Sequence, residues 1–335
     1  MDAAPSSFPS SSPSPQPAAP RPGRSALTRY AGLLAALVAM CVLFGALSEH
    51  FLTAASFRTI ANQIPALAVM AVGMTFVLII GGIDLSVGSV LAFSGAVMSV
   101  AIVQWDLGLP AGIGLALVTG MVCGAFTGTI SVSLRIPSFI VSLGMLEMAR
   151  GGAYTATGSR TEYIGGNVSL ITDPWVAGIS PAFLLALIIV MMGHVLLNRT
   201  VFGRHLIGIG TNEEAMRLAG IDTHPPKILV FMLMGLLSAV GALFQVARME
   251  AADPNAGVGM ELSVIAAVVI GGTSLMGGRG SVLASFFGVL IIAVLESGLA
   301  QIGASEPTKR IITGIVIILA VVLDMYRSRA ASRSS

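Results

Sequence analysis

One carboxylate interrupts a long apolar stretch of this chain. Asp84 is the only acidic residue between Arg58 and Asp106. A charged side chain at the centre of a bilayer costs at least about 2.5–3.5 kcal/mol on insertion scales, so its presence needs a reason. Two interpretations are open. Asp84 or Ser86 caps a helix that begins near Val87, or Asp84 lies on a transport path and bonds a polar solute.

Three further charged groups fall inside apolar segments. Glu147 and Arg150 are spaced to share one helix face, which predicts a structural ion pair. Glu296 is a lone acid late in its segment, with Gln301 five residues further on. The sequence leaves open whether Glu296 faces a pore or extends towards the membrane surface.

Motifs for catalysis and for cofactor binding are absent from the sequence. It contains no G-x-x-x-x-G-K-[ST] phosphate loop, so the chain is not expected to hydrolyse ATP itself. It also lacks H-E-x-x-H, G-x-S-x-G and any Cys/His metal spacing. We therefore expect no catalytic residue, no cofactor and no metal, and no enzyme activity.

The elements that position these groups are predicted to be membrane helices. The chain is 55% hydrophobic and 10% charged, with a mean hydropathy of +0.90, whereas a soluble domain carries about 25% charged residues. Charge-free runs near the length needed to cross a bilayer recur along it. They predict an all-α, polytopic membrane protein of about ten transmembrane helices.

The predicted domain boundaries follow the same composition. Residues 1–28 are rich in Pro and Ser and are expected to be a disordered cytoplasmic tail. Residues 29–328 form the transmembrane domain, and residues 329–335 a short C-terminal tail. With ten crossings both termini share one side, and most Lys and Arg residues outside the spans fall on it. The positive-inside rule then predicts that both termini are cytoplasmic.

A glycine-rich break occurs twice, about 190 residues apart. Ile80-Gly81-Gly82 leads to Gly88-Ser89-Val90-Leu91-Ala92, and Ile270-Gly271-Gly272 leads to Gly280-Ser281-Val282-Leu283-Ala284. Irregular backbone at membrane depth is tolerated only where protein or a watery cavity surrounds it. The pattern predicts an internal repeat of broken helices, which is parallel if ten crossings is right and inverted if one is miscounted. The glycines assigned to the breaks are Gly81, Gly82, Gly88, Gly271, Gly272 and Gly280.

A stripe of small residues marks the span at 107–134. Gly120, Gly124 and Gly128 recur at four-residue spacing, which lets another backbone approach this face closely. Packing within the monomer is the favoured interpretation, and a subunit interface is the alternative.

The segment 204–221 is predicted to lie outside the bilayer. Thr211 and Glu214 have the spacing of a capping box, and Gly220 suits a left-handed helix stop. A helix of about two turns is expected between them. Its exposed apolar face would comprise Ala215, Met216, Leu218 and Ala219. The helix either docks into a groove on another protein or rests on the lipid surface.

Four blocks, in order, resemble the ribose/xylose/galactose-type ABC transporter permeases. They are Ile-Gly-Gly-Ile-Asp-Leu-Ser-Val-Gly-Ser at 80–89, Pro-Ser-Phe-Ile-Val-Ser-Leu-Gly at 137–144, the segment at 210–221, and the second break at 266–280. The resemblance covers roughly residues 30–328. One departure is Met216, where the family often has Ala, and the long Pro/Ser-rich tail is also unusual.

The resemblance implies the permease subunit of an ATP-binding-cassette importer, which translocates a monosaccharide or sugar-like solute. Its partners would be cytoplasmic ATPase subunits, an extracytoplasmic sugar-binding protein and a second permease chain, in the lipid of the cytoplasmic (inner) membrane, with no nucleic acid. The ATPase-coupling residues would be Thr211, Asn212, Glu213, Glu214, Met216, Arg217 and Gly220. Candidate transport-path residues are Asn62, Gln63, Asp84, Ser86 and Ser89. The alternative is an ion-coupled secondary transporter that uses Asp84 or Glu296.

Overall fold

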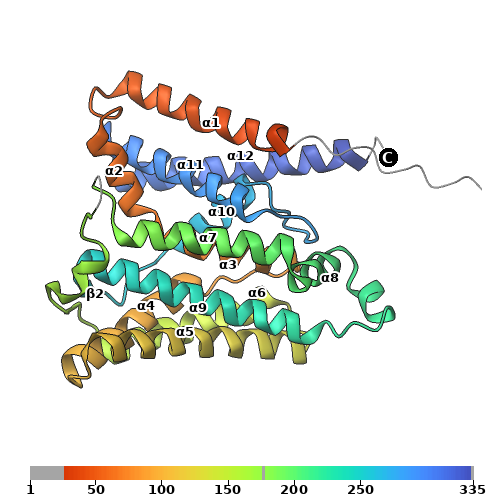
Figure 1. Ribbon diagram of the computed structural model, residues 1–335, viewed down its shortest axis with the longest axis horizontal. Coiled ribbons are helices and arrows are strands. Elements are labelled where there is room, and N and C mark those ends of the chain that lie inside the picture. The colour runs from red at the N-terminus through yellow and green to blue at the C-terminus, as the bar shows by residue number, and fades with distance from the viewer. Residues whose placement is uncertain (1–25, 176–177, 333–335) are drawn as a thin grey trace, which may run out of the picture.

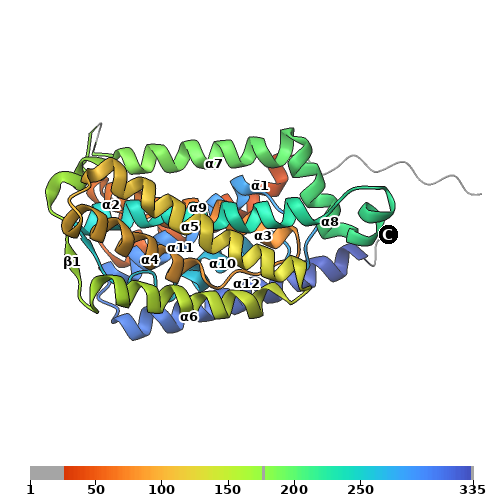
Figure 2. The same cartoon turned by 90° about the horizontal axis from the view of Figure 1, so that it is seen from below.

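The computed structural model describes residues 26–175 and 178–332. In these ranges the chain is a bundle of long helices, with one two-stranded ladder at one end (Figures 1 and 2). The helices are α1 (Ala26–Leu47), α2 (Ala54–Gln63), α3 (Pro65–Ile79), α4 (Val87–Ser99), the π-helical turn η1 (Val100–Gln104), α5 (Gly108–Ser133), α6 (Ser138–Thr157), the short 3-10 helix η2 (Gly166–Ile171), α7 (Pro181–Arg199), α8 (Val201–Leu218), α9 (His224–Met249), α10 (Met260–Ile270), α11 (Val282–Gln301) and α12 (Glu306–Ser332). The all-α prediction is confirmed.

The two ends of the bundle differ. At one end β1 (Glu162–Tyr163) pairs antiparallel with β2 (Ala251–Ala252); we call this the β end. At the opposite end α8 projects beyond the other helices (Figure 1); we call this the α8 end.

The core lies around α3, which is buried along its whole length. Its residues are apolar on every face, as expected of a helix surrounded by others. It packs against α7, α9, α10 and α11. Large apolar side chains remain exposed on α1, α5, α6 and α7, as is typical of helices that face lipid.

Six helices of the described ranges are long and apolar enough to cross a membrane. The bent pair α2 and α3 makes a seventh if it is one span, with a 48° change of direction. Pro65 is the first residue of α3 at this bend. Proline has no backbone N–H to donate to the preceding helical turn, so α2 does not continue into α3 as one straight helix. The polytopic prediction is confirmed, and the count of ten crossings stays a prediction.

The two broken segments run in the same direction. The starts of α3 and α10 line one cavity near the β end, and the N–H of Gly278, beyond α10, donates to the carbonyl of Ile79, at the end of α3, at 2.8 Å. These contacts favour the parallel form of the repeat.

The glycine stripe of α5 packs inside the monomer. A Cβ on Gly120 would overlap the carbonyl of Gly235 in α9, and one on Gly124 would overlap that of Phe231. The favoured interpretation is confirmed, and the subunit-interface alternative is wrong for this face.

Helix bounds lie close to both predicted domain boundaries, which stay predictions. α1 begins at Ala26, so the last residues of the predicted tail 1–28 are helical, and residues 1–25 lie outside the described residues. α12 continues to Ser332, beyond the predicted boundary at 328.

Candidate functional site

The first glycine break is an extended segment supported by a neighbouring helix. Gly81 has φ +75°, a left-handed conformation that ends α3. The backbone N–H of Ile83 donates to the Ser138 hydroxyl of α6 at 2.9 Å, and that of Leu85 donates to the Ser142 hydroxyl at 3.0 Å. Buried backbone groups must be paired, so two α6 hydroxyls replace the missing helical partners.

Asp84 is buried at the start of α4. Its Oδ1 accepts hydrogen bonds from the Ser86 N–H at 2.9 Å and the Ser86 hydroxyl at 2.6 Å. This is the local turn that Asp side chains form ahead of a helix. The structure thus brings Asp84 and Ser86 together, but neither side chain accepts an N–H of the first turn of α4, so the capping interpretation is wrong. Ser89 is buried one turn later, and none of the three lines the large cavity described below.

Gly88 is the point of closest approach between the first break and a distant loop. A Cβ here would overlap the carbonyl oxygen of Gly257 and lie 2.8 Å from Oε2 of Glu261. The loop 253–259, which joins β2 to α10, therefore rests directly on the α4 backbone.

The second break is held by different groups. Gly272, Gly277 and Gly278 all have positive φ. The Ser285 hydroxyl of α11 lies 2.8 Å from Thr75 Oγ1 in α3 and 3.4 Å from Thr273 Oγ1 in the break. Ser281, at the end of the break, accepts the N–H of Ala284 and caps α11.

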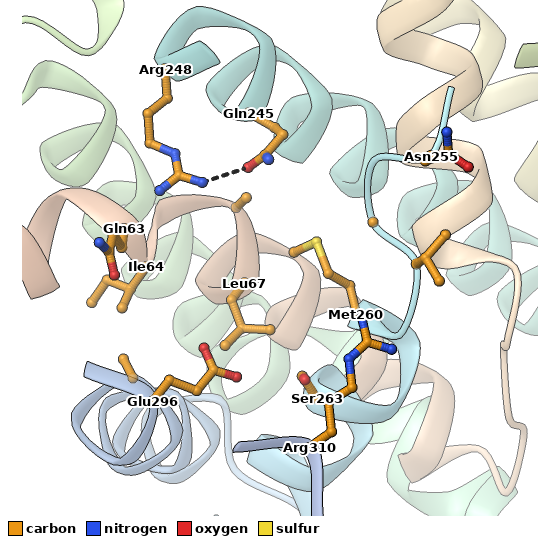
Figure 3. A pocket seen from close by; sticks show the side chains of 14 residues that line it. Gln63, Ile64, Leu67, Gln245, Arg248, Asn255, Met260, Ser263, Glu296 and Arg310 are labelled. Carbon is orange, nitrogen blue, oxygen red and sulfur yellow. Dashed lines mark hydrogen bonds between the residues drawn. The ribbon is translucent and has the colours of Figure 1, made fainter. Parts of the chain in front are cut away.

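A polar cavity of about 560 Å³ opens near the β end. Pockets of this size suit small ligands. It is bounded by the α2–α3 bend, the last turn of α9, the loop 253–259, α11 and the start of α12 (Figure 3). Its polar lining residues are Gln63, Gln245, Arg248, Asn255, Ser263, Glu296 and Arg310.

The chemistry of this lining is mixed. Amide and hydroxyl groups dominate, and they can donate and accept hydrogen bonds with a neutral polyol. Arg248 donates to Oε1 of Gln245 at 3.3 Å (Figure 3). Glu296 is among the residues that line this cavity. The arrangement offers hydrogen-bonding groups to a small polar solute, with Arg248, Glu296 and Arg310 as the charged groups of the lining.

Sequence reasoning found few of these residues. Of the predicted path set only Gln63 lines the cavity. Asn62 points elsewhere: its amide donates to the carbonyl of Gly178 at 3.1 Å and accepts the N–H of Ser180 at 2.9 Å. It fixes the turn ahead of α7. The sequence offered one signal for the cavity residues that were missed. Arg248 and Arg310 lie at the ends of predicted membrane spans.

Arg150 holds the loop 253–259, and Asn255, Gly257 and Val258 of that loop line the cavity. From α6 its Nη1 donates to the carbonyls of Pro254 and Ala256, at 2.5 and 2.9 Å. Glu147 is exposed, and in the part of the chain that the structure describes no ion pair joins it to Arg150. The predicted structural pair is wrong, since a long-range partner holds the guanidinium.

The predicted coupling helix is present, with a different N-cap. α8 kinks at Asn212, which has φ −160° and ψ 95°. Asn212 Oδ1 accepts the N–H of Ala215 at 2.9 Å, as an N-cap does. The Thr211 hydroxyl instead donates to the carbonyl of Ile207, so the capping box is wrong by one residue. Gly220 has φ +80° and forms the predicted left-handed stop.

Glu213 ties this coupling helix, residues 212–219, to α9. It accepts hydrogen bonds from the Thr223 hydroxyl at 2.9 Å and from Lys227 Nζ at 3.0 Å. Partial burial by itself would raise the pKa of the Glu213 carboxyl. The bonds from Lys227 and Thr223 outweigh it and hold the pKa below its ordinary value.

Other side chains of the coupling helix form the predicted face only in part. Glu214 and Arg217 form a surface ion pair at 3.4 Å. Leu218 is 82% exposed. Met216 turns back against Gly208 and the apolar core. The apolar face offered to a partner is therefore narrower than the sequence predicts.

Comparisons with known proteins identify the family of this chain. Residues 56–321 match the family described as "Branched-chain amino acid transport system / permease component". The ribose import permease protein of Escherichia coli K12 is 38% identical over 305 residues, covering 87% of this chain and 92% of the relative. The L-arabinose ABC transporter permease protein of Azospirillum brasilense is 34% identical over 328 residues, 94% of each chain. The fructose import permease protein of Rhizobium meliloti is 29% identical over 313 residues, 89% of this chain and 86% of the relative. No solved structure matches the chain.

These matches extend over the glycine breaks, the coupling helix and the polar cavity alike. With the helical membrane fold and the exposed capped helix, they show that the chain belongs to this family of ABC transport-system permeases and is a transport subunit, not an enzyme.

Proposed function

We propose that this permease imports a monosaccharide or a sugar-like solute, driven by ATP hydrolysis in a separate ATPase subunit. The observation that carries the proposal is the polar cavity, whose lining offers several amide and hydroxyl groups to a neutral polyol. The printed names of relatives that cover most of this chain support it, since they specify ribose, L-arabinose and fructose. Those names do not support the ion-coupled alternative.

The proposed orientation puts the α8 end in the cytoplasm. Arg199, Arg204, Arg217 and Lys227 lie in or beside α8, and cations are enriched on the cytoplasmic side of membrane proteins. The cavity at the β end then faces outwards, where an extracytoplasmic sugar-binding protein delivers the solute. The coupling helix 212–219 faces the ATPase subunits.

The proposed assembly contains two permease chains. Glu147 lies near the middle of α6 and is exposed beside Leu143 and Met148, which are 46% and 59% exposed. A carboxylate facing hydrocarbon is costly, so this face is better covered by protein or water than by lipid. A second copy of the chain is the occupant we propose. A Met148→Cys variant should then form a disulfide-linked dimer in membranes.

Reconstituted uptake tests the whole proposal. The permease, its cognate ATPase subunit and its binding protein are incorporated into vesicles, and entry of radiolabelled ribose, arabinose and fructose is measured. We expect accumulation of at least one sugar that requires ATP and both partners. Omission of each partner in turn is the control. Accumulation by the permease alone, driven by a proton or sodium gradient, would overturn the proposal.

A further inference from the structure

Three segments far apart in the sequence touch through their backbones at the α8 end. The first is the end of α3 at Ile79, which opens the first break. The second is Gly210, two residues before the kink in α8. The third is the pair Gly277 and Gly278 in the second break. The N–H of Gly278 donates to the carbonyl of Ile79 at 2.8 Å.

Glycine makes this contact feasible. A Cβ on Gly210 would overlap both the carbonyl oxygen of Ile79 and the N–H of Gly278. A Cβ on Gly277 would lie 3.0 Å from the Gly210 carbonyl oxygen and 3.1 Å from the Gly81 nitrogen. A Cβ on Gly278 would lie 2.8 Å from Thr211 Oγ1. No side chain fits between the three segments, so none can change rotamer and absorb a displacement. Closely packed protein of this kind transmits strain.

The contact lies beside the coupling helix. Thr211 and Asn212 follow Gly210, and Asn212 caps the helix that the proposed function assigns to the ATPase. On the other side of the contact the chain continues directly into both breaks, through Gly81 and through Gly277. A movement of the coupling helix therefore reaches both breaks over one or two peptide units.

We propose that Ile79, Gly210 and Gly278 form a rigid backbone junction that moves as one body with the coupling helix and carries ATPase-driven movement into both glycine breaks together. This inference rests on the proposed function. The residues of the junction are positioning residues, since they act through the breaks and not on the solute.

A matched pair of variants tests the junction in the complete transporter. Gly210→Ala forces a Cβ into the junction. Gly208→Ala adds the same methyl group one half-turn earlier, where it meets only the end of the flexible Met216 side chain. Uptake, ATP hydrolysis and co-purification of the ATPase subunit are measured for both.

We expect the Gly210→Ala complex to assemble and hydrolyse ATP while its sugar uptake per ATP falls about tenfold, within the range for residues that couple two sites. Gly208→Ala should stay within about twofold of the parent. Uptake per ATP in Gly210→Ala equal to that of the parent would overturn the junction. Absence of ATP-driven uptake in the parent itself would instead count against the proposed function.

A distance measurement keeps the proposal testable if Gly210→Ala does not fold. Thr211 and Met276 are both exposed, Met276 by 89%, and they flank the junction on α8 and on the second break. Cys41 and Cys123 are first replaced by Ala. Spin labels on cysteines introduced at positions 211 and 276 then measure the distance across the junction in the assembled complex. The Thr211–Met276 distance should stay the same when ATP binds, while a Met276–Tyr163 pair, which spans the bundle, changes. A Thr211–Met276 distance that changes with ATP in a transport-competent complex would show that the junction opens, and would overturn the proposal.

Discussion

The two glycine breaks share a sequence pattern and differ in what supports them. In the first, the N–H groups of Ile83 and Leu85 bond two hydroxyls on α6, and a buried Asp84 closes a turn with Ser86. In the second, a hydroxyl cluster around Ser285 and the backbone of α3 provide the support. The first break depends on a neighbouring helix, and the second depends mainly on its own repeat unit and its partner α3.

The surroundings differ in the same way. The first break leads into α4, which carries the loop that borders the cavity at Gly88. The second lies against α8 at Gly278. Both breaks therefore meet α8 at the junction of Ile79, Gly210 and Gly278, while the first break also continues to the loop that borders the cavity. The comparison teaches that a repeated motif fixes the backbone conformation, while tertiary contacts decide its role.

Equivalent glycines of the two copies give the sharpest test of this difference. Gly88→Ala places a methyl group against the fixed carbonyl of Gly257, whereas Gly280→Ala meets the Ile79 and Thr273 side chains. Overpacking costs about 1–3 kcal/mol, and we expect the upper end for Gly88 and the lower end for Gly280. Thermal unfolding of the two purified variants measures the order. Equal destabilisation would mean that the two environments are alike.

The next largest effect is expected where Arg150 holds the loop 253–259. Arg150→Met removes two charge-assisted bonds to the loop 253–259 and should destabilise the protein by about 1.5–3 kcal/mol. Glu147→Gln is the control on the same helix, and in detergent that keeps the chain monomeric it should leave stability unchanged, because Glu147 is exposed on the single chain. Unfolding in detergent with both variants checks this. An equal loss of stability in both variants would support the ion pair between Glu147 and Arg150 that the sequence predicted.

A smaller effect should distinguish the hydroxyls that support each break. Ser142→Ala leaves the partly buried N–H of Leu85 without its acceptor, at a cost of about 1–3 kcal/mol. Ser285→Ala leaves the hydroxyls of Thr75 and Thr273, which can rotate to other acceptors; Thr75 already donates to the Ala71 carbonyl. Polar contacts between membrane helices average about 0.6 kcal/mol, which is the loss we expect there. Chemical denaturation curves give both values.

The smallest effect concerns the coupling helix and pH. The folded-state pKa of Glu213 is lowered, so its bonds to Lys227 and Thr223 contribute stability above the ordinary value of 4.5, and this contribution is lost as pH falls through the lowered pKa. Glu213→Gln should therefore cost up to about 1 kcal/mol near neutral pH, as partly exposed ion pairs do. Melting curves of both proteins across pH should converge under acid conditions. A constant difference at every pH would contradict the assignment.

Local features of the fold could be predicted from the sequence because local chemistry determines them. Glycine pairs within apolar runs indicated both breaks, and Gly220 indicated the helix stop. The N-cap was wrong by one residue, since Thr211 and Asn212 both have capping side chains. Gly210, the residue before Thr211, packs against Ile79. This contact joins segments that are far apart in the chain, so the sequence does not show it.

The cavity could not be predicted because its residues come from segments far apart in the chain. Gln63, Gln245 and Glu296 meet only through helix packing. Asn62 resembles Gln63 in type and position, yet it bonds the turn at Gly178 and Ser180. Neighbouring polar residues on a helix point in different directions, and the sequence alone does not show which direction faces the solute.

The α6 hydroxyls of Ser138 and Ser142 have a consequence for chimaeric permeases. A graft that moved only the helices flanking the first break into a relative lacking these hydroxyls would bring two unpaired amides with it. The smallest transplantable unit therefore includes α6, although α5 separates that helix from the break in the chain. Domain-exchange experiments that respect this boundary should yield folded hybrids more often than those cut at the repeat.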